Sequence, residues 1–232
     1  MSYRINFAEV KRLYLSPAPV TFASAPFTLS GWFKLDNFNT GGLIGLSDST
    51  VEFDYIEVGP NPTSVSTNNT GTIIARTARG SSSATTSFTA GPSPARFAWT
   101  PFVLTVTADN RFGASVSGSA LAYANLPAGS SAWNTLYSGT RAAVGSVAPW
   151  NGLIAAMAVH NGSWDQTLVN LHATGRNPGT MGACLAYWPL TSDLSPVVGG
   201  AALISTAATP EPADNPILTE PPILRPVVIS LF

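Results

Sequence analysis

The stretch Phe27-Thr28-Leu29-Ser30-Gly31-Trp32-Phe33 decides the fold class of this chain, because apolar and polar residues alternate along it. One parity holds Phe27, Leu29, Phe33 and Leu35, and the other holds Thr28, Ser30 and Lys34. A β-strand points successive side chains to opposite faces, so one face packs on a core and the other lies nearer water. Strands of a parallel sheet read instead as near-continuous apolar runs, so the stretch predicts an antiparallel sheet.

Short strands of the same kind are predicted along the rest of the chain. They cover residues 3–7, 51–58, 71–77, 102–107, 111–116, 152–160 and 185–188. Clusters of Gly, Pro, Ser, Asn and Asp separate them at residues 36–42, 59–69 and 90–94, which is turn and loop chemistry. Many short strands with such spacing predict an all-β sandwich or barrel.

One segment, residues 164–174, departs from this pattern and is predicted to be a short surface helix. The signals are Ser163 and Gln166 at capping-box spacing, Leu168 and Leu171 as an apolar stripe, and Gly175 as a left-handed C-terminal cap.

In their order and spacing, these segments resemble the laminin-G-like, concanavalin A-like jelly-roll domains over residues 1–206. The motifs are an opening strand (3–15), an aromatic-rich second strand (27–35), a tryptophan before a Val-Thr strand (99–107), an Asn-Gly-Leu-Ile strand (151–160), the short helix and a closing Tyr-Trp strand (186–190). The resemblance implies an antiparallel β-sandwich (jelly roll). Family members often carry an acidic-glycine pair where this chain has Ala8-Glu9-Val10-Lys11, so no calcium role is carried over to that loop.

Composition narrows the partners that this chain can have. The 232 residues suit a single sandwich domain, charged residues make up only 10%, and the net charge is −1. Scattered Lys and Arg give no basic patch, which argues against nucleic acid and membrane partners. A surface with so few charges suits a protein held in an assembly, and a homo-oligomer is expected.

The residues that most often bind metals or act as nucleophiles are few and dispersed. The single Cys184 is predicted to be a small core hydrophobe. His160 is predicted to be a hydrogen-bonded structural residue and His172 a surface residue of the helix. Neither histidine has ligands at zinc-site spacing, so no metal, no cofactor and no catalytic residue is predicted.

The composition changes after Ala207, which predicts a domain over residues 1–207 and a separate arm over residues 208–232. Six prolines within seventeen residues make this arm extended and semi-rigid. It ends in an apolar, β-prone segment that includes Val227, Val228, Ile229, Leu231 and Phe232. Left free, such a segment would aggregate, so it must dock either on its own sandwich or on a neighbouring chain.

One group of carboxylates resembles the Glu-x-Asp-x-x-Glu signature of retaining glucanases that share the concanavalin A-like fold. In that hypothesis Glu52 is the nucleophile, Glu57 the acid/base and Asp54 a helper, with the two carboxyls about 5–5.5 Å apart. Strict alternation separates Glu52 from Glu57 across the sheet, so the arrangement needs a bulge. The competing interpretation is an ordinary strand with Tyr55 in the core.

Aromatic residues in loop-like stretches offer a different chemistry, because an exposed ring can stack on a sugar. The candidate glycan contacts are Trp150, Trp133, Tyr137 and Asn151. Trp150 is favoured among them because Pro149 and Asn151 flank it.

The leading hypothesis is a non-enzymatic structural protein of a bacteriophage virion, a capsid decoration or a tail-associated protein. It would assemble with other virion proteins through its sandwich and its C-terminal arm. The start of the sequence shows no apolar signal region, which predicts synthesis in the host cytoplasm. The alternative is a carbohydrate-binding module that recognises a host glycan, and the retaining β-glucanase is the third hypothesis.

Overall fold

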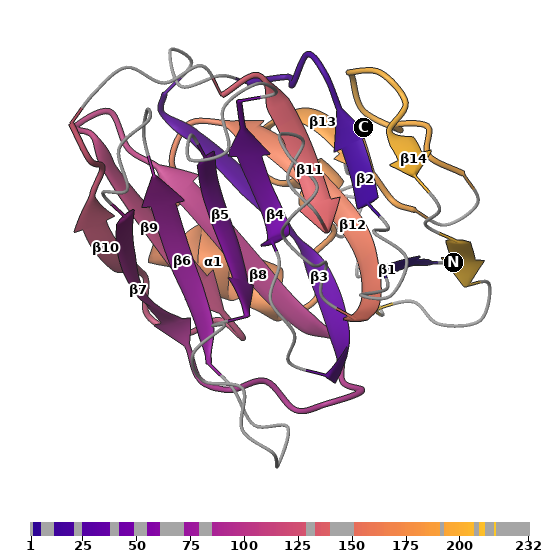
Figure 1. Cartoon of the computed structure of the whole chain (residues 1–232), viewed down its shortest axis with the longest axis horizontal. Helices are drawn as coiled ribbons and strands as arrows, with labels where there is room; N and C mark the ends of the chain where they lie inside the picture. The colour runs from indigo at the N-terminus through magenta and orange to yellow at the C-terminus, as the bar shows by residue number, and fades with distance from the viewer. Residues whose placement is uncertain are drawn as a thin grey trace, which may run out of the picture.

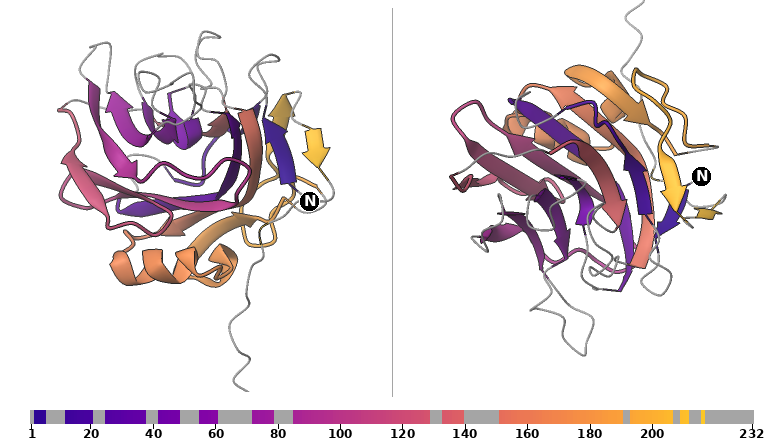
Figure 2. Two further views of the ribbon diagram at one scale, coloured as in Figure 1. Left: turned by 90° about the horizontal axis from the view of Figure 1, so that it is seen from below. Right: turned by 45° about the horizontal axis from the view of Figure 1, so that its top comes forward.

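The computed structural model describes residues 2–5, 12–20, 25–37, 42–48, 55–60, 72–78, 85–128, 133–139, 151–190, 193–206, 209–211 and 216. Within these ranges the chain forms two antiparallel β-sheets that face each other, with one short α-helix outside them (Figures 1 and 2). This confirms the all-β antiparallel sandwich that the alternation in residues 27–35 predicts.

Sheet A has eight strands among the described residues, in the order β10-β9-β8-β3-β12-β1-β15, with β13 also paired to β12. Their bounds are β1 (Ser2–Ile5), β3 (Phe27–Asn37), β8 (Thr100–Val106), β9 (Arg111–Val116), β10 (Ala122–Asn125), β12 (Asn151–Asn161), β13 (Ala183–Trp188) and β15 (Thr209–Glu211).

Sheet B has seven strands among the described residues, in the order β14-β2-β11-β4-β5-β6-β7, and Figure 1 looks onto it. Their bounds are β2 (Arg12–Leu15), β4 (Gly42–Ser47), β5 (Tyr55–Pro60), β6 (Ile73–Ala78), β7 (Thr85–Gly91), β11 (Thr135–Gly139) and β14 (Ile204–Thr206).

The core lies between the two sheets and is built from the alternate residues of each strand. Its largest fully buried side chains include Trp133, Trp188, Phe27, Phe33, Phe102 and Phe112. Burial of one such side chain contributes roughly 1.5–3 kcal/mol. Phe27 and Phe33 share the parity that the sequence assigns to the core, so that part of the prediction is confirmed.

The outer face of sheet A is covered by helix α1 (Gln166–Ala173) and the 3₁₀ helix η3 (Pro178–Thr180), and the left view of Figure 2 shows α1 against that side. The helix starts at Asp165, whose side chain accepts a hydrogen bond from the Leu168 backbone N–H. The expected capping box of Ser163 and Gln166 is therefore wrong. At the other end, Gly175 takes the predicted left-handed conformation, with φ +91°.

The buried face of α1 also differs from the expected one. Val169 and His172 are buried, whereas Leu171 is exposed. Gln166 lies against the β9–β10 connection, where it accepts a hydrogen bond from the Leu121 backbone N–H and donates one to the Ser119 carbonyl. The helix is therefore fixed to the sheet by polar contacts as well as by apolar packing.

The start of the predicted arm belongs to the sandwich. Strand β15 pairs with β1 at the edge of sheet A, directly after β14 has paired with β2 at the edge of sheet B. Pro210 is compatible with this position, because an edge strand tolerates a missing N–H. The boundary predicted after residue 207 thus falls between β14 and β15, and the division into a domain and an arm stays a prediction. The apolar segment Val227, Val228, Ile229, Leu231 and Phe232 lies outside the described residues, so its docking stays a prediction.

A chain that ends at Glu211 keeps β15, whereas a chain that ends at Ala207 loses it. We expect the shorter chain to have a free energy of unfolding lower by about 1–3 kcal/mol, because it loses a few backbone hydrogen bonds along β1. Urea unfolding followed by tryptophan fluorescence measures this difference. Equal stability of the two chains would show that β15 contributes nothing to the sandwich.

Candidate functional site

A row of six residues crosses sheet B from β2 to β7, one from each strand. Consecutive members are paired in register: Tyr14, Tyr137, Gly45, Glu57, Arg76 and Ser87. We call this set the cross-strand row. It lies on the outer face, because the intervening residues Ile56, Val58 and Ala75 belong to the core between the sheets.

Three side chains of the cross-strand row form one buried polar network. The Arg76 guanidinium pairs with Glu57, its Nε donating to Oε1. The Tyr137 hydroxyl donates to the other carboxylate oxygen, Oε2. Both oxygens of a fully buried carboxylate are thereby hydrogen-bonded. Such pairing is what a buried charge requires, and removing one partner of a buried ion pair typically costs about 3–5 kcal/mol.

Two glycines of β4 make the space for this network. A Cβ at Gly45 would lie 2.4 Å from the Ile56 carbonyl oxygen and 2.9 Å from Cζ of Tyr137. A Cβ at Gly42 would lie 2.7 Å from Oε2 of Glu57. The tyrosine ring therefore lies over β4 and reaches β5 because these positions have no side chain.

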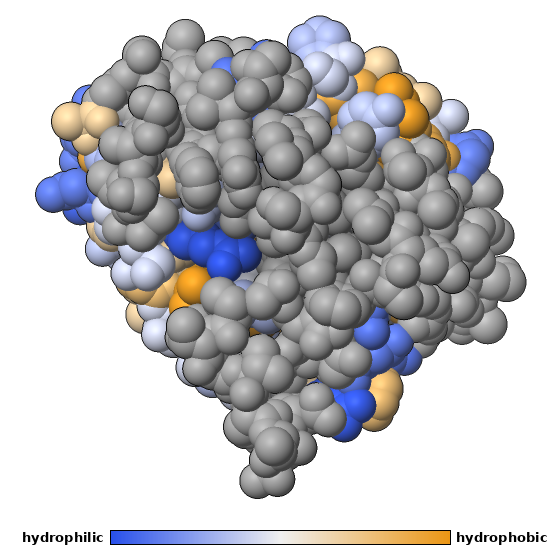
Figure 3. Space-filling model, in the orientation of Figure 1, coloured by the Kyte–Doolittle hydropathy of each residue, from blue (hydrophilic) through white to orange (hydrophobic). Residues whose placement is uncertain are grey.

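The guanidinium of Arg76 is fixed by Glu57, but one of its nitrogen donors has no hydrogen-bond partner among the described residues. Its side chain is only 10% exposed. Its Nη2 has no hydrogen-bond partner among the described residues. Figure 3 shows a strongly hydrophilic patch in a recess of this face, over the region of β5 and β6. Glu57 and Arg76 are the charged residues of those two strands, and Glu57 has no exposed surface.

The rest of this outer face is polar in character. Ser47 pairs with Tyr55 and Thr135, is almost fully buried, and also has an Oγ without a partner among the described residues. Ser87, directly opposite Arg76, is exposed. Buried polar groups without partners are uncommon in folded proteins, and two on one face call for an explanation.

The structure corrects two of the predicted glycan contacts. Trp133 is fully buried in the core, and Tyr137 is fully buried in the network with Glu57, so neither ring is available for stacking on a sugar. Trp150 lies outside the described residues, and Asn151 is a half-buried residue of β12 in sheet A, paired with Asn37. For these two residues, glycan contact stays a prediction.

The carboxylates of the glucanase hypothesis are described only in part. Glu52 and Asp54 lie outside the described residues, whereas Glu57 forms the network described above. The expectation that Tyr55 faces the core is wrong, since Ile56 and Val58 fill the core from this strand. Sequence reasoning also missed Arg76, whose only signal is its position as a lone charge within an apolar strand.

The two histidines lie together under helix α1. His160 contacts Ser30 Oγ through Nε2 at 3.2 Å and the Met181 carbonyl through Nδ1 at 3.1 Å, which confirms its structural role. His172 is not a surface residue as predicted. It is fully buried, its Nε2 lies 3.1 Å from the Gly31 carbonyl, and its ring contacts Trp32 and Trp164.

Burial controls the protonation of both histidines, because a charged imidazole loses its hydration inside the protein. Burial, together with the charge of His172, lowers the pKa of His160 to about 3. Burial lowers the pKa of His172 to about 4. Burial also raises the pKa of the half-buried Cys184 thiol to about 11, so this thiol packs as a small hydrophobe at the margin of the Trp32 cluster.

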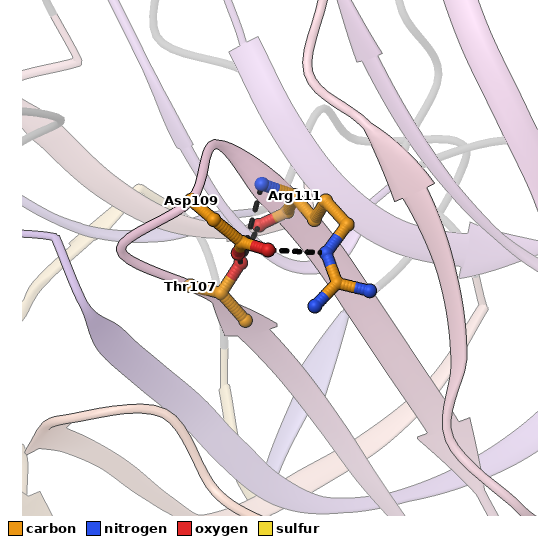
Figure 4. Close-up of polar contacts among 3 residues, drawn as sticks. All are labelled: Thr107, Asp109 and Arg111. Atoms are coloured by element: carbon orange, nitrogen blue, oxygen red, sulfur yellow. Dashed lines mark hydrogen bonds and ion pairs between the residues drawn. The ribbon is translucent and has the colours of Figure 1, made fainter.

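A second arginine with a different environment, Arg111, begins strand β9 in sheet A, directly after the turn from β8. Arg111 Nε donates to Asp109 Oδ2 at 2.8 Å, and Thr107 donates to the other carboxylate oxygen (Figure 4). The Thr107 hydrogen bond is the main cause that lowers the pKa of Asp109. Both ionic side chains are largely exposed, so this is an ordinary surface ion pair of little energetic weight.

The described residues contain neither a cluster of metal-binding side chains nor a membrane-spanning helix. No three His, Cys, Asp or Glu side chains come together there as metal ligands. No helix within the described ranges has the length and apolarity needed to cross a membrane.

Known proteins resemble this chain in structure but not in sequence. No protein-family model matches it, and no curated protein matches it. The heptameric SAP-like pentraxin of Limulus polyphemus superposes with a TM-score of 0.60 at 14% identity, covering 88% of this chain and 92% of the pentraxin. A candidate carbohydrate-binding protein of Bacteroides ovatus gives a TM-score of 0.65 at 13% identity, covering 93% of this chain and 60% of that protein.

These similarities show the fold. The chain is a jelly-roll β-sandwich. Domains LG4-5 of the mouse laminin α1 chain are also similar, with a TM-score of 0.47 at 13% identity over 68% of this chain and 40% of that one. The superpositions with TM-scores of 0.60 and 0.65, together with the sheet topology, confirm the expected fold class, with the short helix on the outer face of sheet A.

Acid destabilises the layer under α1. Each unfolded histidine binds a proton near pH 6.5, whereas the folded ones do so only near pH 3 to 4, so stability falls as the pH drops below about 6.5. Between pH 7 and pH 5 we expect a loss of up to about 2 kcal/mol per histidine. Urea unfolding at both pH values measures it, and a His160→Gln/His172→Gln variant that kept the full pH dependence would contradict it.

The hydroxyl of Tyr137 supports the Glu57 carboxylate. In Tyr137→Phe this buried oxygen loses its donor, so we expect the free energy of unfolding to fall by about 1–3 kcal/mol. Tyr123→Phe, at an exposed ring, is the matched control and should change it by less than about 0.5 kcal/mol. In a Glu57→Gln background the cost of Tyr137→Phe should shrink, and the same cost in both backgrounds would separate Tyr137 from Glu57.

Proposed function

We propose that this chain is a non-enzymatic carbohydrate-binding module that holds a glycan against the outer face of sheet B, at the cross-strand row. One observation carries the proposal: Arg76 Nη2 and Ser47 Oγ are buried on this face and have no partner among the described residues. Sugar hydroxyl and ring oxygens are suitable acceptors for such donors. A few fixed polar groups on a rigid, mostly apolar scaffold are typical of a small-molecule site.

The network of Glu57 favours binding over hydrolysis. A retaining glycosidase needs one carboxylate free to attack and a second to donate and accept a proton. Both oxygens of Glu57 are instead occupied by Arg76 and Tyr137. In the proposal the carboxylate fixes the guanidinium in place and does not react. The roles assigned to Glu52 and Asp54 in the glucanase hypothesis stay predictions.

The similar structures support the proposal. The Bacteroides ovatus protein is described as a candidate carbohydrate-binding protein, and this chain spans 60% of it. At 13% identity its binding residues do not transfer, so the site proposed here depends on this chain's own side chains. Neither the Bacteroides ovatus protein nor the pentraxin is described as a virion component. The virion role, the homo-oligomer and the virion localisation stay predictions from the sequence.

A glycan array with the full chain tests the proposal, with two variants that add the same bulk on opposite faces. Ser87→Leu places it beside Arg76 on the outer face of sheet B, and Thr167→Leu places it on the exposed side of α1. We expect the wild-type chain and Thr167→Leu to bind the same glycans and Ser87→Leu to bind them at least about tenfold more weakly, because of steric exclusion.

Equal binding by both variants would place the glycan elsewhere on the molecule. Failure of the wild-type chain to bind any glycan would overturn the proposed function. Thermal unfolding of each variant shows whether a loss of binding is a loss of folding.

A further inference from the structure

We propose that the glycan carries a carboxylate and that this group binds the guanidinium of Arg76. The inference deepens the proposed function and rests on it, because it names the chemical class of sugar that the cross-strand row selects. The recognised class is an acidic sugar, such as a uronic or sialic acid, and not its neutral counterpart.

Arg76 is held in a fixed orientation before any ligand arrives. Its Nε is directed to Glu57, and Glu57 is held on its other oxygen by Tyr137. A guanidinium is planar, so fixing Nε also fixes the direction of the Nη groups. Little conformational freedom remains to be lost on binding, which is the usual advantage of a preorganised site.

The free donor of Arg76 is of the kind that a carboxylate satisfies best. Nη2 has no partner among the described residues, although nine-tenths of the side chain is buried. A buried N–H of a charged group gains most from a charged acceptor, because the surrounding medium screens the attraction weakly. Hydrogen bonds between a guanidinium and a carboxylate are charge-assisted and are therefore among the strongest in proteins. A neutral hydroxyl offers a single, weaker acceptor.

Access to Arg76 is possible from the side of β7. Ser87 lies directly opposite Arg76 and is exposed, and Thr89, two residues further along the same strand, is exposed as well. Residues paired across strands have Cβ atoms about 5 Å apart, so a ligand that contacts Ser87 lies beside the Arg76 side chain. The hydroxyls of Ser87 and Thr89 are positioned to contact the remainder of the sugar.

Arg111 differs from Arg76 because its ion pair is exposed to water, whereas that of Arg76 is buried. Its guanidinium pairs with an exposed carboxylate, Asp109, and lies 5.2 Å from the centre of the Tyr123 ring. An exposed guanidinium of this kind is hydrated and selects no anion. It therefore serves as the matched control, since the same substitution at Arg111 removes the same charge from the other sheet.

The experiment measures the affinity of the full chain for matched pairs of glycans by calorimetry. The probes are trigalacturonic acid and its methyl ester, together with sialyllactose, its methyl ester and lactose. Esterification removes the charge and leaves the sugar skeleton unchanged. We expect at least one acid to bind about tenfold or more tightly than its own ester, as the loss of one charge-assisted contact requires.

Two variants connect this preference to Arg76. Arg76→Lys keeps the charge and loses the planar donor pair, so its preference for the acid should fall about tenfold. Glu57→Gln/Arg76→Gln removes both buried charges together, which avoids leaving a lone buried carboxylate, and it should bind acid and ester equally. Arg111→Gln should keep the wild-type preference. Circular dichroism and thermal unfolding establish that each variant is folded.

The outcomes separate the two proposals. If the wild-type chain binds an acid and its ester equally, or the ester more tightly, the carboxylate inference is overturned and the proposed function stands. If binding of the acid persists unchanged in the folded double variant, Arg76 is not the contact and the inference is also overturned. If neither these probes nor the neutral glycans of the array bind, the proposed function fails, and the inference fails with it.

Discussion

The antiparallel pairing of β3 with β12 is the interaction on which the rest of this structure depends. Both strands are eleven residues long, and they pair from Phe27 and Asn161 at one end to Asn37 and Asn151 at the other. β8 pairs with the free side of β3, while β1 and β13 share the free side of β12. One face of the pair carries core residues of the sandwich, and the other supports helix α1. Each other layer is therefore positioned relative to this pair.

The two outer faces satisfy their buried polar groups in different ways. On sheet A, Thr28 and Thr105 hydrogen-bond to each other and Thr28 accepts from the Trp164 backbone N–H, while the two histidines bond to neighbouring carbonyl and hydroxyl groups. That face is covered by helix α1. On sheet B, the polar network ends at Arg76 Nη2, which has no partner among the described residues. An internal network that ends in a free charged donor is suited to an external acceptor. The groups without a partner under α1, which are Trp32 Nε1, Trp164 Nε1 and His172 Nδ1, lie instead on a face that the helix covers.

The sequence identifies strands well where the pattern is long and the turn residues are clear. Residues 27–35, 102–107, 111–116 and 152–160 all lie within or overlap strands of the structure. The sequence pattern predicts no strand at β4, β7, β10, β11, β14 or β15. β4 reads Gly-Leu-Ile-Gly-Leu-Ser, and its glycines resemble turn residues although they clear space for Tyr137. β11 is only five residues long, so Trp133 and Tyr137 were assigned to loops. The pattern places His172 on the surface, although it is fully buried, because one polar residue on a short helix gives no sign of burial.

The candidate site could not be predicted from the sequence, because its residues come from strands that are far apart along the chain. Tyr137, Gly45, Glu57 and Arg76 come from four strands, and register alone brings them together. Glu57 was considered as a catalytic acid because its neighbours in sequence are Glu52 and Asp54. Its neighbours in space are a guanidinium and a phenol, which stabilise its charge and occupy both of its oxygens. A carboxylate in that environment orients the arginine beside it. The chemistry of this face then depends on Arg76 Nη2, the donor that has no partner among the described residues.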